Sequence, residues 1–332
     1  MPIIFFEINS GTNHHQSAFI GFSFFKSNNT SQGMQNQMFG ILIFFFVVIQ
    51  MMFQIIPVFV VQRTLYEARE RQSKTYAWQA FVLTNIVVEF AWNSVKPSPP
   101  PYTNSSNELT PNQSQLMAII CFVVWFYPLG VYENAQYTDT MHSRSTLALL
   151  IVWVLFLFAS SMAHMLIAGV TSDELASSFA NILSIMLYAF CGILAGPDAL
   201  PGFWIFMYRV NPFTYVTSGL LSTSLGNVPM HCADNELLAF SAPPNQTCAE
   251  YLRPFIEMSG GEVMNPMASG DEQCQYCSVN WTNDFLRGVG IDFETRWRDF
   301  GLLWVYVVFN VSAAVFLYWL CRVPKGKKKA KE

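Results

Sequence analysis

Residues 38–61 read MFGILIFFFVVIQMMFQIIPVFVV, without a single Asp, Glu, Lys or Arg. A helix needs about 20 mostly apolar residues to cross the roughly 30 Å hydrocarbon core of a bilayer. This run therefore predicts a transmembrane helix. Three more uncharged runs meet the same criterion and predict further spans, at residues 146–169, 176–196 and 301–321.

The composition of the whole chain supports the same class of protein. Of the 332 residues, 52% are hydrophobic and only 12% are charged, whereas about a quarter of the residues in a soluble domain are charged. A soluble enzyme and a disordered chain are therefore disfavoured. The formal net charge of −4 leaves no basic excess for binding nucleic acid. We expect an all-α polytopic membrane protein whose surface contacts membrane lipid.

A fifth apolar region is interrupted. Residues 79–94 and 116–131 are each too short to span comfortably, and residues 95–115, VKPSPPPYTNSSNELTPNQSQ, separate them. A Pro-rich polar stretch cannot continue a helix or lie exposed to lipid. We interpret residues 95–115 as a non-native insert, a short intron translated by mistake, because its removal joins two halves of one apolar helix. The alternative is a real loop with glycan acceptors at Asn104 and Asn112.

Basic residues indicate which side of the membrane is cytoplasmic, because Lys and Arg concentrate in the short cytoplasmic flanks of spans. They cluster after the first span and after the last: Arg63, Arg69, Arg71, Lys74, Arg322, Lys325, Lys327, Lys328, Lys329 and Lys331. The C-terminus is therefore predicted to be cytoplasmic. Residues 225–300, which precede the last span, then form a large external loop.

The cysteines and sequons of residues 225–300 agree with an external position. The loop holds Cys232, Cys248, Cys274 and Cys277, and glycosylation candidates at Asn245 and Asn280. An oxidising exterior favours disulfides among the four cysteines over a metal site at Cys274-x-x-Cys277. Four cysteines allow three pairings, which their spacing does not resolve.

Residues 196–224 are apolar and aromatic but carry Pro197, Pro201, Pro212 and Arg209. Proline breaks a helix, and broken helices are tolerated in a membrane only where protein buries them. We therefore expect short re-entrant helices here, dipping back into the outer leaflet, and not a straight span.

The sequence contains no motif for nucleotide binding or for catalysis. It lacks the phosphate-binding G-x-x-x-x-G-K-[ST], the nucleophile elbow G-x-S-x-G, the zinc motif H-E-x-x-H and a dinucleotide fingerprint. We therefore expect no catalytic residue, no metal and no cofactor in this chain. A membrane-embedded enzyme would need paired ionisable groups in its spans, which offer His164 as their one histidine.

Four strings resemble the second transmembrane domain of fungal pleiotropic drug resistance transporters, which are full-size ABC exporters of the G type. They are IPVFVVQRTLYEARERQSKTYAW at 56–78, FVLTNIVVEFAWNS at 81–94, LPGFWIFMYRVNPFTYVTSGLLS at 200–222 and FLYWLCRVPKGKKKAKE at 316–332. The resemblance implies an ABC-2 type (type V exporter) transmembrane domain with re-entrant helices and a disulfide-bonded external loop. It assigns this domain to residues 17–224, the loop to 225–300, the last span to 301–321 and a basic cytoplasmic tail to 322–332. Residues 1–16 match nothing in the family.

The resemblance also implies a coupling role for residues 62–80. In this family the corresponding loop carries a coupling helix, which rests on a nucleotide-binding domain and transmits its closure to the membrane domain. Glu70, Arg71, Lys74 and Tyr76 occupy the positions of contacts to that domain. Gln72 departs from the proline that the family leads us to expect after Arg-Glu-Arg.

By this resemblance, the chain is the substrate-translocating half of an ATP-driven exporter of hydrophobic compounds, drugs or lipids, in the plasma membrane. Its partners would be the other transmembrane half and the nucleotide-binding domains, which bind ATP and Mg²⁺. Because family members carry two such domains and twelve spans, we expect a truncated chain that does not hydrolyse ATP by itself. The alternative is a non-transporting membrane remnant or interaction protein. ATP-dependent efflux from vesicles containing only this chain would distinguish the two.

Overall fold

The computed structural model describes residues 13, 15–27, 29–94, 117–136, 140–269 and 272–323. Residues 15–23 are helical. The longer helices are α2 (Ser31–Leu65), α3 (Trp78–Ser94), α4 (Met117–Leu129), α6 (Met141–Gly169), α7 (Asp173–Ala189), α9 (Pro212–Leu225), α10 (Cys248–Ser259) and α12 (Arg296–Arg322). The short elements are η1 (Tyr66–Glu70), α5 (Val131–Gln136), η2 (Pro197–Ala199), α8 (Ile205–Val210), α11 (Thr282–Gly288), η3 (Phe293–Thr295), β1 (Leu238–Ser241), β2 (Glu262–Val263) and β3 (Gln273–Cys277).

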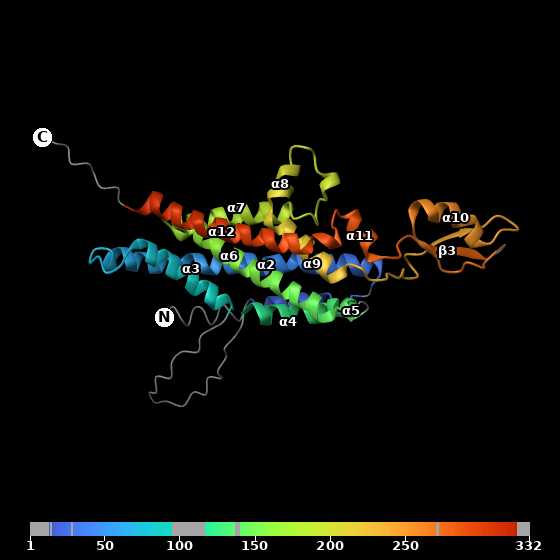
Figure 1. Ribbon diagram of the computed structural model, residues 1–332, viewed down its shortest axis with the longest axis horizontal. Helices are drawn as coiled ribbons and strands as arrows, with labels where there is room; N and C mark the ends of the chain where they lie inside the picture. Colours follow the sequence, from blue (N-terminus) through green and yellow to red (C-terminus); the bar gives the residue numbers. More distant parts are fainter. Residues whose placement is uncertain are drawn as a thin grey trace, which may run out of the picture.

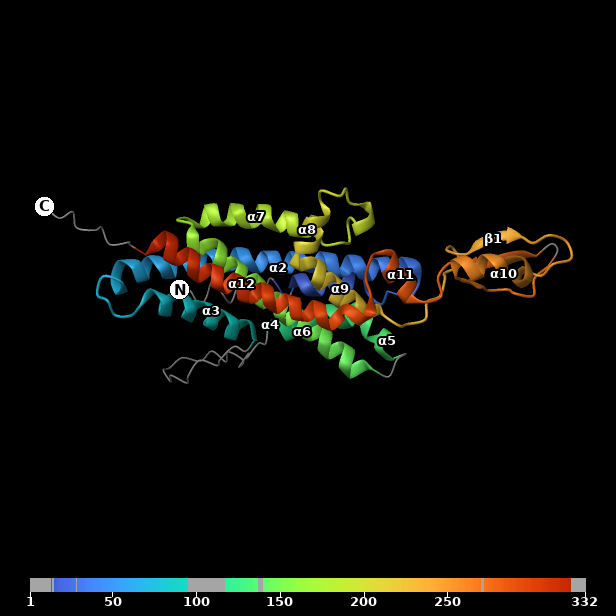
Figure 2. The same ribbon diagram turned by 45° about the horizontal axis from the view of Figure 1, so that its top comes forward.

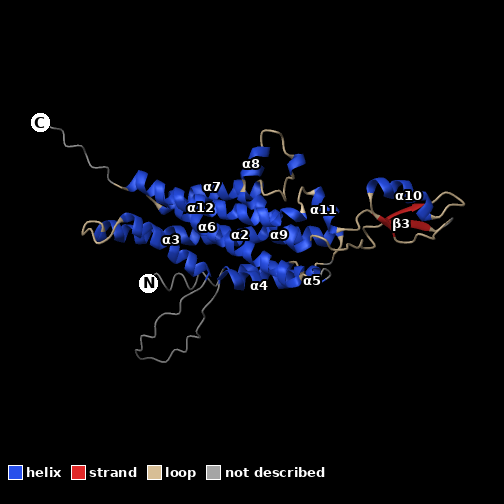
Figure 3. Cartoon of the chain, viewed as in Figure 1, coloured by secondary structure: helices blue, strands red, loops and turns tan. Residues whose placement is uncertain are grey.

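The long helices run along a common axis, and a small unit containing the strands extends from one end of this bundle (Figures 1 and 3). The turn between α2 and α3 and the carboxyl end of α12 lie at the opposite end of the bundle (Figure 1). The α2–α3 turn and the cysteines of residues 225–300 thus lie at opposite ends of the bundle.

Three segments in the described part of the chain are long and apolar enough to cross a membrane. They are Ser31–Glu70, His142–Gly169 and Phe293–Arg322. They contain the predicted spans at 38–61, 146–169 and 301–321, and they confirm a mostly helical integral membrane protein.

The predicted span at 176–196 is correct as a helix but wrong in its extent. α7 begins at Asp173, after the capping hydroxyl of Ser172, and ends at Ala189. Gly192 in the following turn has a φ of +91°, in the left-handed region that favours glycine. The 17 residues of α7 reach only about 26 Å at 1.5 Å per residue, so α7 alone falls short of the hydrocarbon core.

α6 is the central helix of the bundle. Of its most apolar 18 residues, 78% are buried, against 22% in the corresponding window of α12. Two polar side chains of this core bond to protein: His164 Nδ1 lies 2.8 Å from Ser160 O, and Asn310 Nδ2 of α12 donates to Ser161 Oγ at 3.3 Å. α6 therefore lies at the centre of the helix packing, whereas most of the apolar window of α12 is left uncovered by the described part of the chain.

α3 and α4 are the two parts of the interrupted apolar region. Both pack against α6, and they contact each other. The end of α3 lies near the start of α4 in both views (Figures 1 and 2). The predicted insert at 95–115 lies outside the described residues, as do almost all of the unmatched segment 1–16 and residues 324–332 of the basic tail.

The region 196–224 is broken into η2, α8 and α9, as its prolines predict. Asn211 separates α8 from α9, and its Oδ1 accepts from Phe213 N at 2.9 Å. Pro212 is the first residue of α9, a position where its missing N–H is not needed. α9 is buried along its length and contacts α12, where Ser218 Oγ donates to Asp299 Oδ2 at 2.6 Å. That these helices re-enter a membrane leaflet stays a prediction.

The cysteine-rich loop, residues 225–300, folds around a three-stranded sheet of order β1-β3-β2. β3 is central and antiparallel to both neighbours, with Phe240 opposite Cys274 and Val263 opposite Tyr276. α10 begins with a capping box formed by Thr247 and Glu250, which satisfies backbone N–H groups at its amino end. The loop thus has a small apolar core of its own, separate from that of the helix bundle.

Candidate functional site

The α2–α3 segment, residues 62–80, carries the four residues predicted to contact a nucleotide-binding domain. α2 passes at Leu65 into the π-helical turn η1, which closes with a bond from Arg71 N to Tyr66 O at 2.9 Å. The chain then reverses through Lys74, at a φ of +53°, and α3 begins at Trp78. The segment is therefore a helical continuation of α2 followed by a tight turn.

Glu70 and Tyr76 contact each other across this turn. The Tyr76 hydroxyl donates to Glu70 Oε2. This bond to the carboxylate is the main cause that raises the pKa of Tyr76 to about 12. The Tyr76 ring lies 5.2 Å from the ring of Tyr66, which stacks on Phe81 at 4.4 Å. The pair thus connects the exposed surface of the turn to the first turns of α3.

Arg71 and Lys74 lie beside a groove in the same segment. Together with Tyr76 and Trp78 they line a groove of about 350 Å³. Arg71 Nη2 donates to the backbone oxygen of Arg322 at 3.0 Å. Arg71 thus connects the turn to the carboxyl end of α12, a role that its position in the sequence does not indicate.

Arg63, which the sequence indicates only as a basic residue of the cytoplasmic flank, is buried in the structure. The side chain is 2% exposed and donates to Ile167 O at 2.9 Å and to Val170 O and Thr171 O, each at 2.8 Å. These carbonyls lie at the end of α6, where the last C=O groups of a helix have no partner within it. No local signal could reveal this contact, because its partners lie more than 100 residues along the chain.

The cysteine-rich loop contains two disulfides. They join Cys232 to Cys277 and Cys248 to Cys274, at sequence separations of 45 and 26 residues. This finding confirms a disulfide-bonded loop and selects one of the three possible pairings. The first bond ties the entry of the loop to the end of β3, and the second ties α10 to β3.

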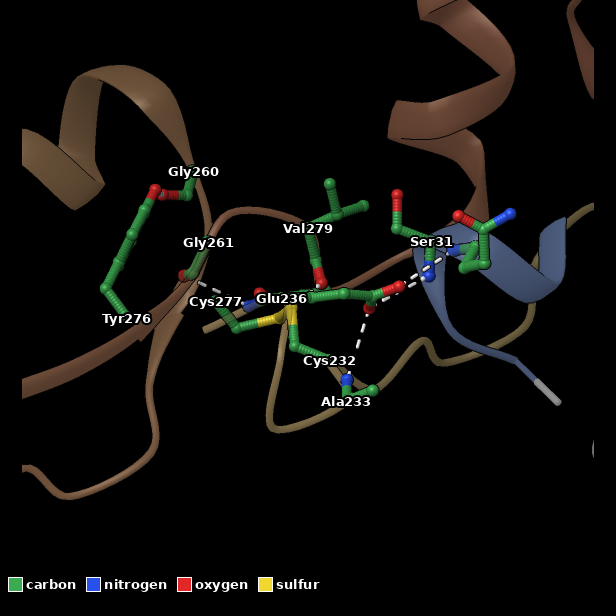
Figure 4. Close-up of a disulfide and its surroundings, with 11 residues drawn as sticks. Ser31, Cys232, Ala233, Glu236, Gly260, Gly261, Tyr276, Cys277 and Val279 are labelled. Atoms are coloured by element: carbon green, nitrogen blue, oxygen red, sulfur yellow. Dashed lines mark hydrogen bonds between the residues drawn. A yellow bond between two sulfur atoms is a disulfide. The ribbon is translucent and has the colours of Figure 1, made fainter. Parts of the chain in front are cut away.

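Glu236 connects the cysteine-rich loop to the helix bundle. Its carboxylate accepts from Ser31 N at 3.2 Å and Gln32 N at 2.8 Å, the first two N–H groups of α2, and from Ala233 N at 3.1 Å. Figure 4 shows Glu236 beside the Cys232–Cys277 bond, with its carboxylate directed at Ser31. A carboxylate is favourable at a helix amino terminus because the helix dipole and the unpaired N–H groups are positive there.

The two predicted glycosylation candidates also lie in this loop, Asn245 before α10 and Asn280 before α11.

An apolar pocket of about 210 Å³ lies between α6, α7, α12 and the link from α8 to α9. It is lined by Phe158, Met162, Met165, Leu183, Met186, Leu187, Met207, Val210, Asn211, Pro212, Tyr306, Phe309 and Asn310. Its polar side chains bond to protein, since Asn211 Nδ2 donates to Leu187 O and Tyr306 Oη to Val210 O, each at 2.7 Å. Methionine adapts to varied apolar shapes, so the pocket suits hydrophobic compounds that offer few hydrogen bonds.

Comparison with known proteins gives a family and several relatives. The family of ABC-2 type transporters matches residues 12–97 and 113–225. The unmatched residues between these ranges lie within the predicted insert at 95–115. The matched family is a membrane domain, which agrees with the lack of a nucleotide-binding motif in this chain.

The relatives are fungal transporters. The chain is 65% identical over 94% of its length to ABC multidrug transporter F of Aspergillus fumigatus. It is 45% identical over 93% of its length to ABC multidrug transporter C of the same fungus, and 45% identical over 94% to ABC multidrug transporter atrG of Aspergillus oryzae. It covers 20%, 19% and 19% of these three proteins, so it spans about a fifth of the length of the relatives it matches.

The apolar helices, the two disulfides and these matches agree with one another. The family match covers most of the helix bundle, and the relatives align with nearly the whole chain, including the cysteine-rich loop. The chain therefore belongs to the ABC-2 type transporter family, as a membrane domain similar to that of fungal ABC multidrug transporters of the pleiotropic drug resistance type.

Proposed function

We propose that this chain is the substrate-translocating membrane half of an ATP-driven exporter of hydrophobic compounds in the plasma membrane. In this mechanism a nucleotide-binding domain rests on the α2–α3 segment, and its closure on ATP and Mg²⁺ rocks this half against the other transmembrane half. The cavity between the halves then changes from cytoplasmic to external access. The observation that carries the proposal is the set of contacts that leads from the α2–α3 segment into the bundle.

Three arginines make those contacts. Arg71 donates to the end of α12, Arg322 of α12 donates to Val170 O, and Arg63 donates to the same carbonyl at the end of α6. A displacement of the turn that carries Glu70 and Tyr76 would therefore move the ends of α2, α6 and α12 together. Such a set of contacts is what a segment needs in order to transmit force to several helices at once.

The class of substrate is supported by the apolar pocket and by the relatives. The side chains that line the pocket present hydrocarbon and thioether surface, and the polar groups of Asn211 and Tyr306 are already bonded to the protein. Three relatives are named multidrug transporters. A pocket of this kind selects by shape and apolar area, which suits a range of hydrophobic compounds.

The proposal places the α2–α3 segment in the cytoplasm and the cysteine-rich loop outside. This orientation follows the basic residues at one end of the molecule. It also puts both disulfides on the oxidising side of the membrane.

The test is a charge reversal in a full-length transporter that contains this chain. Glu70→Arg removes the acceptor of the Tyr76 hydroxyl and places a cation beside Arg71, so the docking surface loses its shape and charge. We expect drug efflux to fall at least tenfold, while ATP hydrolysis and surface expression persist, because the nucleotide-binding domain would no longer fit this surface. A tenfold fall corresponds to a loss of about 1.4 kcal/mol in the free energy of coupling.

The matched control is Glu262→Arg, the same change on the exposed edge of the cysteine-rich loop. It should leave both efflux and hydrolysis unchanged. Normal efflux in the Glu70→Arg protein would show that the α2–α3 segment is an ordinary solvated turn.

A further inference from the structure

The two sequons of the cysteine-rich loop have different surroundings. Asn245 lies in an exposed turn formed by residues 243–246. Gln246 N donates to Pro243 O at 3.3 Å, and Asn245 at the third position of this turn has a φ of +74°. Proline at the second position and asparagine at the third are the residues that a turn with a positive φ favours there.

The rest of the first sequon leads into the start of α10, with Gln246 exposed. Thr247 is half-buried, and its hydroxyl accepts from Glu250 N at 3.3 Å at the start of α10. Asn245 thus lies on the outer surface of the loop, while Thr247 is partly covered and bridged to Ser269. A sugar at Asn245 would extend into solvent without displacing any hydrogen bond of the sheet.

Asn280 takes part in the structure of the loop. Its Nδ2 donates to Gly261 O at 3.1 Å, and its Oδ1 is buried without a partner among the described residues. Its backbone oxygen accepts from Met230 N at 2.9 Å. Gly261 is itself closely packed, because a Cβ added there would lie 2.4 Å from the hydroxyl oxygen of Tyr276. The amide of Asn280 therefore packs against the closely packed backbone at Gly261.

The third residue of the second sequon is buried as well. Thr282 is 0% exposed, its N–H donates to Val228 O at 3.1 Å, and its hydroxyl accepts from Val228 N at 3.1 Å. Residues 280–282 and 228–230 thus pair as two extended segments, with Pro229 bridged to Trp281. A glycan on Asn280 would have to separate these segments before the loop could close.

We propose that Asn245 is the N-glycosylation site of the cysteine-rich loop, and that Asn280 is an unmodified residue that holds the end of the loop together. The inference rests on the external position of the loop in the proposed function. In the reaction, Asn245 Nδ2 forms a bond to the anomeric carbon of an oligosaccharide carried on a lipid pyrophosphate. The bond from that carbon to the pyrophosphate oxygen breaks, and Nδ2 loses one proton.

The experiment maps glycan occupancy on the full chain, expressed in fungal cells and purified from the membrane fraction. Enzymatic deglycosylation in ¹⁸O water converts each glycosylated Asn to a heavy-labelled Asp, which mass spectrometry of peptides then locates. Peptide mapping replaces gel mobility because further sequons begin at Asn28, Asn29, Asn104, Asn112 and Asn310. We expect the label at Asn245 and not at Asn280 in the wild-type chain.

Two variants separate the roles of the asparagines. Asn245→Gln should remove the label from the loop completely and leave its resistance to protease unchanged. Asn280→Gln should keep the label at Asn245 but make the loop more sensitive to protease, because the bond to Gly261 O is lost. Label at Asn280 equal to or above that at Asn245 in the wild-type chain would overturn the inference.

A third variant tests the position of the loop independently. Leu237→Thr makes the exposed Asn235 an acceptor while leaving Glu236 in place. Label at Asn235 but not at Asn245 would show that the loop is external and that the choice of Asn245 is wrong. Label at neither residue would contradict the external position itself, and the inference would fail with it.

Discussion

Arg63 shows how much one buried cation contributes to the bundle. Its three bonds to backbone carbonyls are charge-assisted, and its replacement removes all three, leaving Val170 O with its bond from Arg322 and Ile167 O with its bond from Val170 N. We expect Arg63→Met to lower the free energy of unfolding by about 2–4 kcal/mol, measured by denaturant unfolding in detergent micelles. Arg63→Lys should restore part of this loss, since one ammonium group keeps the charge but lacks the planar fork.

The control for Arg63 is Arg69→Met, which removes an exposed cation six residues further along the same segment. We expect a change below about 0.5 kcal/mol, because exposed substitutions rarely exceed that value. Equal losses in the two variants would mean that the bonds to α6 do not stabilise the fold.

Gly261 is the residue at which backbone conformation constrains the cysteine-rich loop most directly. Its φ is +90°, and a Cβ there would lie 2.4 Å from Tyr276 Oη and 2.5 Å from Cys277 O. We expect Gly261→Ala to destabilise the loop by about 1–3 kcal/mol, from strained backbone and close contact. Limited proteolysis of the folded protein should then cleave the loop faster. Gly288→Ala, at a glycine whose added Cβ would meet nothing within 4 Å, should leave the cleavage rate unchanged.

At the scale of elements, α3 and α4 form two parts of what we predict to be one helix. α3 has 17 residues and α4 has 13, while the neighbouring α2 and α6 have 35 and 29. Both short helices pack along α6, and the family match is interrupted between them. Removal of residues 95–115 would place Leu116 between the two helices and give an uninterrupted apolar helix long enough to span a membrane.

The prediction for this element is that mature messenger RNA lacks the 63 nucleotides that encode residues 95–115. Sequencing of cDNA checks it directly, and the flanking codons should join Ser94 to Leu116. At the protein level, the shortened chain should be more stable in the membrane, because a polar insert within an apolar helix leaves backbone groups unsatisfied in lipid. Transcripts that uniformly retain the 63 nucleotides would require a real loop at this position.

At the scale of the whole molecule, the two ends of the bundle differ in chemistry. One end carries Arg63, Arg71, Lys74 and the carboxyl end of α12, and the other carries two disulfides and the capping carboxylate of Glu236. This polarity is the physical basis for the proposed orientation, because cations favour the cytoplasmic side and disulfides persist only where the environment is oxidising.

Sidedness can be measured with a thiol reagent that does not cross membranes. On intact cells we expect no labelling of Cys232, Cys248, Cys274 or Cys277 until a reductant opens the disulfides, and strong labelling afterwards. Cys321, at the opposite end of the molecule, is a free cysteine and provides an internal control. It should label only after the membrane is permeabilised. Labelling of Cys321 in intact cells, with the loop cysteines unreactive even after reduction, would reverse the orientation.

The amino-acid pattern alone predicted the class of the protein and the places of its long helices. Uncharged apolar runs correctly located α2, α6 and α12, because the length of a span and its lack of charge are properties of contiguous residues. The prolines of the region 196–224 correctly predicted that it is broken into short helices, because the effect of a proline on a helix is local. The end of α7 was misplaced, since apolar composition continues past Ala189 while Gly192 turns the backbone.

Which residues contact one another could be read only from the folded chain. The pairing of four cysteines, the cap that Glu236 places on α2 and the bonds from Arg63 to α6 all join residues distant in the sequence, where spacing carries no information about proximity. Glu70 and Tyr76, both predicted contacts to a nucleotide-binding domain, are also bonded to each other. The turn that brings them together has a geometry that the sequence does not specify. Apolar patterns specify which segments are buried, but the contacts between their polar groups depend on how the helices pack.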